Sequence, residues 1–266
     1  MKDIDETKAP LLEHLIELRK RLLWSVAAIG ACFAVCISFA DDIFGFLVWP
    51  LTEAFGPGQG KLVYTKLYEA FFVEVKVALF AAVFLSFPIL ASQLWAFVAP
   101  GLYAKEKKAF LPFIIATPIL FLLGASLAYF VVMPTAFKFF LKFQGPVGGL
   151  QQEALPAMGE YLSLVMHFIL AFGISFLMPV LLMLMERAGL VSRQQLKSGR
   201  RYMIVVAFVI AAVFTPPDVV SQLMLAIPLI ILYEITLIAI WFTERRRAKD
   251  RPDGEENAIA EAKPAE

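Results

Sequence analysis

Residues 161–185 read YLSLVMHFILAFGISFLMPVLLMLM, and His167 is the only Asp, Glu, Lys, Arg or His among them. As a helix rising about 1.5 Å per residue, such a run crosses a hydrocarbon core of about 30 Å. Comparable apolar runs occupy Leu22–Phe39, Phe71–Phe97 and Pro112–Met133. The chain is 60% hydrophobic and 18% charged, whereas soluble domains are about 25% charged. We therefore expect an integral membrane protein built from helices.

Two further apolar segments, Tyr202–Phe214 and Leu223–Phe242, are separated by the strong break Thr215–Asp218, which contains two prolines. As a helix, the first of them is only about 20 Å long. We predict a helical hairpin whose tip stops short of the far membrane surface. The expected fold class is an all-α integral membrane protein with six transmembrane helices, of which the fifth and sixth are short.

Basic residues gather in every second connection. They occur in the N-terminal segment, around Lys105, between Arg187 and Arg201, and after Glu244. The opposite connections have few lysines near them: Lys61, Lys66, Lys138 and Lys142. Cytoplasmic loops of membrane proteins carry an excess of Lys and Arg. With six spans, this asymmetry predicts that both termini face the cytoplasm.

The chain divides into three predicted regions: an amphipathic cytoplasmic segment at 1–21, the six-helix membrane domain at 22–243, and a disordered cytoplasmic tail at 244–266. No small-residue cleavage pattern follows the first apolar run, so we expect a retained helix. The long outer connections, Asp41–Tyr68 and Pro134–Glu160, contain apolar and aromatic residues typical of a membrane interface. We expect both connections to be structured.

The sequence offers no set of residues for catalysis. It contains no Gly-rich phosphate loop, and its two histidines are far apart. Cys32 and Cys36 lie one helical turn apart in an apolar run, which favours small buried or lipid-facing residues over a disulfide or a metal site. The net charge of +1 gives no case for nucleic-acid binding. We expect neither enzymatic activity nor a metal or cofactor.

Two acids lie near the predicted cytoplasmic surface, and each has two interpretations. Glu17 can form an ordinary ion pair with Arg21 on the same helix face, or it can be presented to a cationic ligand. Glu106 lies among lysines of a basic loop, where it can be merely solvated or can bind a ligand. The residues alone leave both alternatives open.

Other ionisable residues lie within the predicted spans or at their ends. Glu74 lies near the outer end of the second span, and it does not share a helix face with Lys76. Glu234 lies about 15 Å before Glu244 along a helix, close to mid-membrane, where an acid has a function or is protonated and packed. Asp218 begins the sixth helix as an N-cap, which does not exclude contact with a partner.

Three motifs occur in order along the chain: His14–Leu22, reading HLIELRKRL; Trp95–Tyr103, reading WAFVAPGLY, followed by Glu106; and Thr215–Val219, reading TPPDV, followed by Gln222. Together they resemble the TatC family, the multispanning subunit of the twin-arginine protein translocase. The three motifs in this order make the resemblance highly specific.

The resemblance covers about Leu11–Phe242 and implies a cupped bundle of six helices with both termini in the cytoplasm. It implies binding of signal peptides with paired arginines. By matching motifs, Glu17 and Glu106 would hold the arginines, with Arg19 and Phe97 beside them. An Arg fork can bind a carboxylate through two parallel hydrogen bonds, which Lys cannot reproduce.

The implied partners are single-span TatA-like and TatB-like subunits, signal peptides of folded cargo and membrane lipid, in a multimeric complex of the bacterial cytoplasmic membrane. Candidate positions for partner contact or translocation are Pro50, Asp218, Gln222 and Glu234. Many relatives carry Glu in the fourth span where this chain has Leu177, so a mechanism that needs that acid is in doubt here.

The alternative function is an ion-coupled transporter of small solutes that uses Glu74 and Glu234. Such a transporter needs polar residues from several spans to converge at mid-depth, and the sequence offers few. The positions of the acids distinguish the two functions, because a receptor needs them at the cytoplasmic rim.

Overall fold

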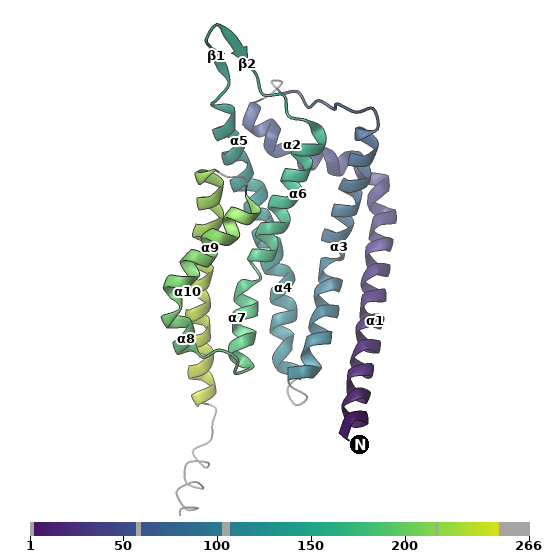
Figure 1. Cartoon of the computed structure of the whole chain (residues 1–266), viewed down its shortest axis with the longest axis vertical. Coiled ribbons are helices and arrows are strands. Elements are labelled where there is room, and N and C mark those ends of the chain that lie inside the picture. Colours follow the sequence, from purple (N-terminus) through teal and green to yellow (C-terminus); the bar gives the residue numbers. More distant parts are fainter. Residues whose placement is uncertain (1–2, 57–59, 103–106, 216–217, 250–266) are drawn as a thin grey trace, which may run out of the picture.

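The computed structural model of the chain describes residues 3–56, 60–102, 107–215 and 218–249. These residues are helical apart from their connections and one small hairpin (Figure 1). The α-helices are α1 (Asp3–Cys36), α2 (Ala40–Phe55), α3 (Glu69–Leu102), α4 (Lys107–Leu127), α5 (Met133–Leu141), α6 (Met158–Ser175), α7 (Met178–Arg187), α8 (Arg193–Ser198), α9 (Arg200–Phe214) and α10 (Val219–Lys249). A 3-10 turn, η1 (Ile37–Phe39), joins α1 to α2, and a π-helical turn, η2 (Ala128–Val132), joins α4 to α5. Strands β1 (Gly145–Val147) and β2 (Leu150–Gln152) form the antiparallel hairpin.

Five helical stretches of the described chain are long and apolar enough to cross a membrane. They are His14–Phe55, Glu69–Phe97, Pro112–Leu141, Met158–Arg187 and Val219–Arg245. The predicted membrane protein with several apolar helices is thus confirmed. The fifth predicted segment is helix α9, which has 15 residues and reaches about 22 Å. Its short length agrees with the prediction, and whether α9 is a sixth span stays a prediction.

The sixth predicted helix was also expected to be short, and this is wrong: α10 has 31 residues, because the helix continues past Phe242 to Lys249. The tail predicted to be disordered from residue 244 is therefore helical as far as Lys249, and residues 250–266 lie outside the described residues.

Helices α9 and α10 pack side by side as the predicted hairpin. In the view of Figure 1 their junction lies well below the β1–β2 hairpin. The predicted N-cap is confirmed, because Asp218 Oδ2 accepts a hydrogen bond from the Ser221 backbone N–H at 2.6 Å. The carboxylate thereby satisfies one of the free N–H groups at the start of α10.

The bundle is tightest where α4 crosses α6, because each helix offers a glycine to an aromatic residue of the other. A Cβ built on Gly124 would lie 2.5 Å from the Phe172 carbonyl oxygen, and one on Gly173 would lie 2.6 Å from the Phe121 ring. Phe121 and Phe172 are fully buried at this crossing. Small residues let membrane helices approach closely, where dispersion contacts replace the hydrophobic effect as the source of attraction.

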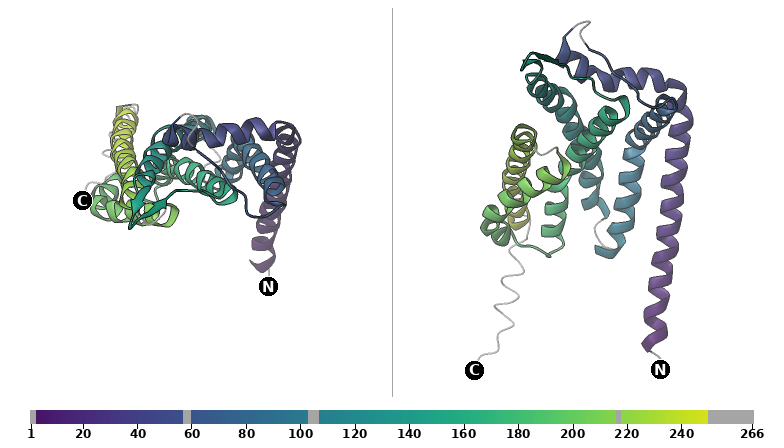
Figure 2. Two further views of the ribbon diagram at one scale, coloured as in Figure 1. Left: turned by 90° about the horizontal axis from the view of Figure 1, so that it is seen from above. Right: turned by 45° about the horizontal axis from the view of Figure 1, so that its top comes forward.

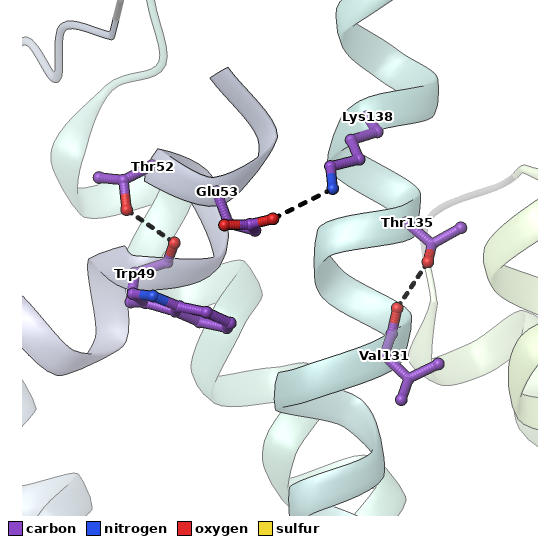
Figure 3. A network of polar contacts seen from close by, with 6 residues as sticks. All are labelled: Trp49, Thr52, Glu53, Val131, Thr135 and Lys138. Atoms are coloured by element: carbon purple, nitrogen blue, oxygen red, sulfur yellow. Dashed lines mark hydrogen bonds and ion pairs between the residues drawn. The ribbon is translucent and has the colours of Figure 1, made fainter. Parts of the chain in front are cut away.

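The two long connections expected on the outer side, Asp41–Tyr68 and Pro134–Glu160, contain helices and strands in their described residues, as predicted. Helix α2 lies crosswise to α1 over one end of the bundle (Figure 2), and α5 rises beside it towards the hairpin. Lys138 of α5 forms an ion pair with Glu53 of α2 at 3.4 Å (Figure 3). We call α2, α5 and the β1–β2 hairpin the cap, and the end of the bundle that they cover the cap end.

Helix α1 stands at the edge of the bundle and packs mainly against α3 (Figure 1). Cys36 is buried against Ala78 and Ala82, and Cys32 is half-buried in the same contact. Both cysteines are free thiols used for packing, as the sequence predicted. Much of the remaining surface of α1 is exposed and apolar, which suits contact with lipid.

Candidate functional site

Glu17 lies on α1, where it is half-buried and paired with Arg21. Arg21 Nε donates to Glu17 Oε1 at 3.0 Å, and Arg21 Nη2 contacts the same oxygen. The ordinary i, i+4 ion pair predicted from sequence is therefore present. Among the described residues Glu17 Oε2 accepts no hydrogen bond. Glu17 thus keeps one oxygen for a further donor.

The N-terminal motif meets the end of α3 through a pair of rings. His14 stacks on Phe97 with centroids 4.2 Å apart and planes 19° apart. His14 precedes Glu17 by about one helical turn, so the stack brings Phe97 to the helix that carries Glu17. Arg19 is exposed on the same helix. Sequence analysis did not single out His14 as a contact, although the first motif begins with it.

Glu106 falls outside the described residues. Its predicted place on one surface with Glu17 therefore stays a prediction. Of the four predicted signal-peptide residues, Glu17 and Arg19 lie on α1 shortly after His14, whose ring stacks on Phe97 of α3.

Trp95 of the second motif has a structural contact that its sequence position did not reveal. Its indole Nε1 donates to Thr117 Oγ1 of α4 at 2.7 Å, and both side chains are buried. Thr117 in turn donates to the Phe113 carbonyl at 2.7 Å. The sequence predicted an interfacial aromatic here, whereas the ring fastens α3 to α4 just before Phe97.

Two buried polar groups at the start of α10 have no partner among the described residues. Asp218 Oδ1 and the Ser221 hydroxyl are buried and make no hydrogen bond within the described residues. Gln222 Nε2 reaches back to the Phe208 carbonyl of α9 at 3.3 Å. An unsatisfied buried polar group costs about 1–3 kcal/mol, so a hydrogen bond from a partner molecule to these groups would be stabilising.

Pro50 is buried in the middle of α2, where it acts on the cap. Proline has no N–H, so the carbonyl of Phe46 loses its usual helical donor. The Tyr129 hydroxyl of η2 donates to that carbonyl at 2.6 Å. The Tyr161 hydroxyl of α6 donates to the next carbonyl, that of Leu47, at 2.9 Å. Pro50 thus frees an acceptor that fastens α2 to the bundle.

Glu234 forms an ion pair with Arg200, the first residue of α9, at 2.8 Å. The adjacent Tyr233 hydroxyl donates to the Leu196 carbonyl of α8 at 2.6 Å. The sequence placed Glu234 near mid-membrane and Arg200 in a basic connection. Because the two side chains form an ion pair, they lie at the same depth in the bundle. Both side chains are more than 40% exposed, which does not match an acid packed inside a bundle.

The acids required by the transporter alternative do not converge. Glu74 is exposed on α3 and Glu234 lies on α10, and α4, α6 and α7 stand between these helices (Figure 1). The described residues contain no group of three or more His, Cys, Asp or Glu side chains that could hold a metal ion. Leu177, where many relatives carry an acid, lies in the break between α6 and α7.

Comparison with known proteins identifies the chain. Residues 13–228 match the family model of the Sec-independent protein translocase protein TatC. The chain belongs to the TatC family. TatC of Magnetococcus marinus is 54% identical over 244 residues, covering 92% of this chain and 88% of that one. TatC of Escherichia coli K12 is 39% identical over 230 residues, covering 86% and 87%.

The fold agrees with this assignment. A crystal structure described as the twin arginine translocase receptor TatC matches with a TM-score of 0.73 and 38% identity, covering 85% of this chain and 98% of that one. The TatC resemblance seen in the motifs is thus confirmed. This TatC-family chain is a membrane component of a protein translocase, a transport protein rather than a catalytic enzyme.

Proposed function

We propose that the chain is the twin-arginine signal-peptide receptor and assembly core of a Tat translocase that moves folded proteins across the bacterial cytoplasmic membrane. The observation that carries the proposal is the contact between the first two motifs. The His14–Phe97 stack joins them, one turn from the half-buried carboxylate of Glu17, whose Oε2 accepts no hydrogen bond from the described residues. The solved relative described as a twin arginine translocase receptor supports it.

In this proposal Glu17 binds one arginine of the signal peptide and Glu106 binds the other. Arg21 is paired with Glu17 Oε1 in the free protein. The guanidinium of the signal peptide binds Oε2 or displaces Arg21 from Oε1. The exchange retains an ion pair throughout, so no charge is left unpaired in the half-buried position. The planar guanidinium fork fits a carboxylate, and a lysine ammonium does not reproduce that geometry.

The proposed topology has six spans, with both termini and the Glu17 site in the cytoplasm. The alternation of basic connections supports it. In this arrangement α9 is the short fifth span, and the cap lies on the opposite side of the membrane. A short span is tolerated where neighbouring protein or a thinned bilayer shelters its ends.

The single-span TatA-like and TatB-like subunits are proposed to dock at the tip of the α9–α10 hairpin. The unsatisfied atoms of Asp218 and Ser221 support this site, because a polar group on a partner helix can satisfy them. Gln222 lies on the next turn with its amide held by α9. In this proposal, the complex is multimeric through such contacts.

The test is a titration of the detergent-solubilised full chain with a labelled twin-arginine peptide and with the same peptide carrying two lysines. We expect the lysine peptide to bind more weakly. Glu17→Gln and Glu106→Gln should each weaken arginine-peptide binding by about 1.5–3 kcal/mol, roughly one to two decades of affinity. Glu153→Gln, an exposed acid in the connection after β2, serves as the matched control. Equal binding of both peptides, with affinity unchanged in all three variants, would contradict the proposal.

A further inference from the structure

A groove of about 400 Å³ runs between α3 and α6. Each helix lines it with one stripe of residues at positions i, i+3, i+4 and i+7, beginning at Lys76 on α3 and at Ser163 on α6. Four residues from each helix thus form the two walls. All of them belong to the described part of the chain, and none belongs to the site proposed for the signal peptide.

Two nitrogen-bearing side chains, those of Lys76 and His167, face this groove from opposite walls. Among the described residues Lys76 has no ion pair or hydrogen bond, and no carboxylate lines the groove. The nearby Glu74 lies two positions before Lys76 and so on another face of α3. The lining therefore has an excess of positive charge with no counter-charge of its own.

The hydrogen bonds inside the groove leave groups free for a ligand. His167 Nδ1 lies 2.7 Å from the Ser163 carbonyl, so an N–H there donates to the backbone and Nε2 stays free. The Ser163 hydroxyl donates to the Gly159 carbonyl at 2.7 Å, and its lone pairs offer no attraction to an anion. An anion in the groove would therefore be held by the Lys76 ammonium, with the His167 imidazole on the facing wall.

The polar residues lie at one depth, towards the cap end. Glu69 Oε1 accepts the Gly159 N–H at 2.9 Å, which sets the starts of α3 and α6 at one level. At 1.5 Å per residue, Lys76 lies about 10 Å below Glu69, and His167 about 12 Å below Gly159. The next residues along the stripes, ending at Val83 and Leu170, are all apolar. The groove thus changes from cationic near the end of the bundle to apolar towards its middle.

We propose that this groove binds one anionic phospholipid. The phosphate pairs with Lys76 and His167, and one acyl chain lies along the apolar part between Leu79 and Leu170. Along its length the groove changes in polarity as a phospholipid does, with charge near the membrane surface and hydrocarbon towards the centre. A long Lys side chain can reach several ångströms towards the surface, which brings its ammonium to headgroup depth. The net positive lining favours an anionic headgroup over a zwitterionic one, whose ammonium it repels.

The experiment measures lipid binding to the purified full chain in detergent by native mass spectrometry, with phosphatidylglycerol and phosphatidylcholine of identical acyl chains. We expect phosphatidylglycerol to bind the unsubstituted protein more tightly. Lys76→Gln should lower its affinity about tenfold and remove the preference over phosphatidylcholine. His167→Gln should lower it by a smaller factor. Lys142→Gln changes an exposed lysine outside the groove and should leave the preference intact.

A second variant separates the headgroup from the chain. Val83→Trp fills the apolar end and should weaken both lipids equally, while the preference for phosphatidylglycerol remains. Inorganic phosphate should not compete, since it has no chain for the apolar end. Competition by inorganic phosphate would show that the groove binds a free anion rather than a lipid. Displacement of phosphatidylglycerol by a single-span helix with one Glu, but not by the same helix with Gln, would identify a partner carboxylate instead. Equal binding of both lipids, unchanged in Lys76→Gln, would overturn the proposal.

Discussion

The two ends of helix α3 are held in very different ways. At the cap end, Glu69 accepts hydrogen bonds from Gly159 of α6 and from Thr65 in the preceding connection. Two further bonds, from Tyr129 and Tyr161, fasten α2 across the bundle. At the other end, Trp95 donates one buried hydrogen bond to Thr117 of α4, and Phe97 meets α1 through the ring stack with His14.

The same contrast separates α6 from α1. In the helical stretch Met158–Arg187, 50% of an 18-residue apolar segment is buried inside the protein. In the stretch His14–Phe55, only 6% of such a segment is buried. Helix α6 is therefore fixed by its neighbours, and α1 depends on its contact with α3. The difference teaches that hydrogen bonds between helices fasten the cap end, whereas the proposed receptor residues of α1 lie on a helix that packs mainly against α3.

The largest effect should follow from closing the α4–α6 crossing. Gly173→Leu places a side chain where even a Cβ would lie 2.6 Å from the Phe121 ring, so the helices must separate. We expect loss of folded, monodisperse protein in detergent, measured by size-exclusion chromatography. Gly30→Leu is the matched control, because a Cβ there meets no atom within 4 Å. Equal yields of the two variants would show that the crossing does not hold the bundle together.

The hydrogen bonds of the cap should give the next largest effect. Tyr129→Phe leaves the Phe46 carbonyl without a donor and should destabilise the protein by about 1–3 kcal/mol, measured by thermal unfolding in detergent. Adding Pro50→Ala should recover part of the loss, since an alanine at that position supplies the N–H that proline lacks.

Peptide binding sharpens this test, because the cap lies at the far end from Glu17. We expect Tyr129→Phe to leave twin-arginine peptide affinity unchanged in the folded protein. Tyr64→Phe, at an exposed tyrosine, is the control for the loss of a hydroxyl. A destabilisation that Pro50→Ala only increases would contradict the role assigned to Pro50.

A smaller effect should appear at the open end. Arg21→Gln releases Glu17 from its internal partner and should tighten twin-arginine peptide binding by at most about fivefold. That factor corresponds to the roughly 0.2–1 kcal/mol of a part-exposed ion pair. The measurement is the same titration at low and at high salt, with Lys20→Gln as the control for a lost positive charge. Weaker binding in Arg21→Gln would mean that Arg21 positions Glu17 rather than competing for it.

The smallest effect should come from the pair that joins α10 to α9. Glu234→Gln and Arg200→Gln should each lower stability by no more than about 1 kcal/mol, because both side chains are part-exposed. The double variant should resemble either single one, since the two act as a unit. Protein transport by a reconstituted translocase should persist in Glu234→Gln. Complete loss of protein transport in a folded Glu234→Gln variant would show that Glu234 is a functional acid.

The sequence by itself predicted the membrane class, all six apolar helical segments, the α9–α10 hairpin and the family, although it made the second helix of that hairpin too short. These follow from local properties: the length of an apolar run, the helix break at two prolines and the order of short motifs. The N-cap at Asp218 and the Glu17–Arg21 pair were also predictable, because each joins residues within one turn of helix.

Only the tertiary structure decided which distant groups meet. The Tyr129 hydroxyl reaches a carbonyl freed by Pro50, Trp95 finds Thr117, and Glu234 finds Arg200. Each contact joins residues on different helices, and its existence depends on how those helices are rotated and shifted against one another. Hydrophobic periodicity does not determine that rotation when most faces of a membrane helix are apolar. Close packing at Gly124 and Gly173 sets it for α4 and α6, and the hydrogen bonds from Tyr129 and Tyr161 set it for α2.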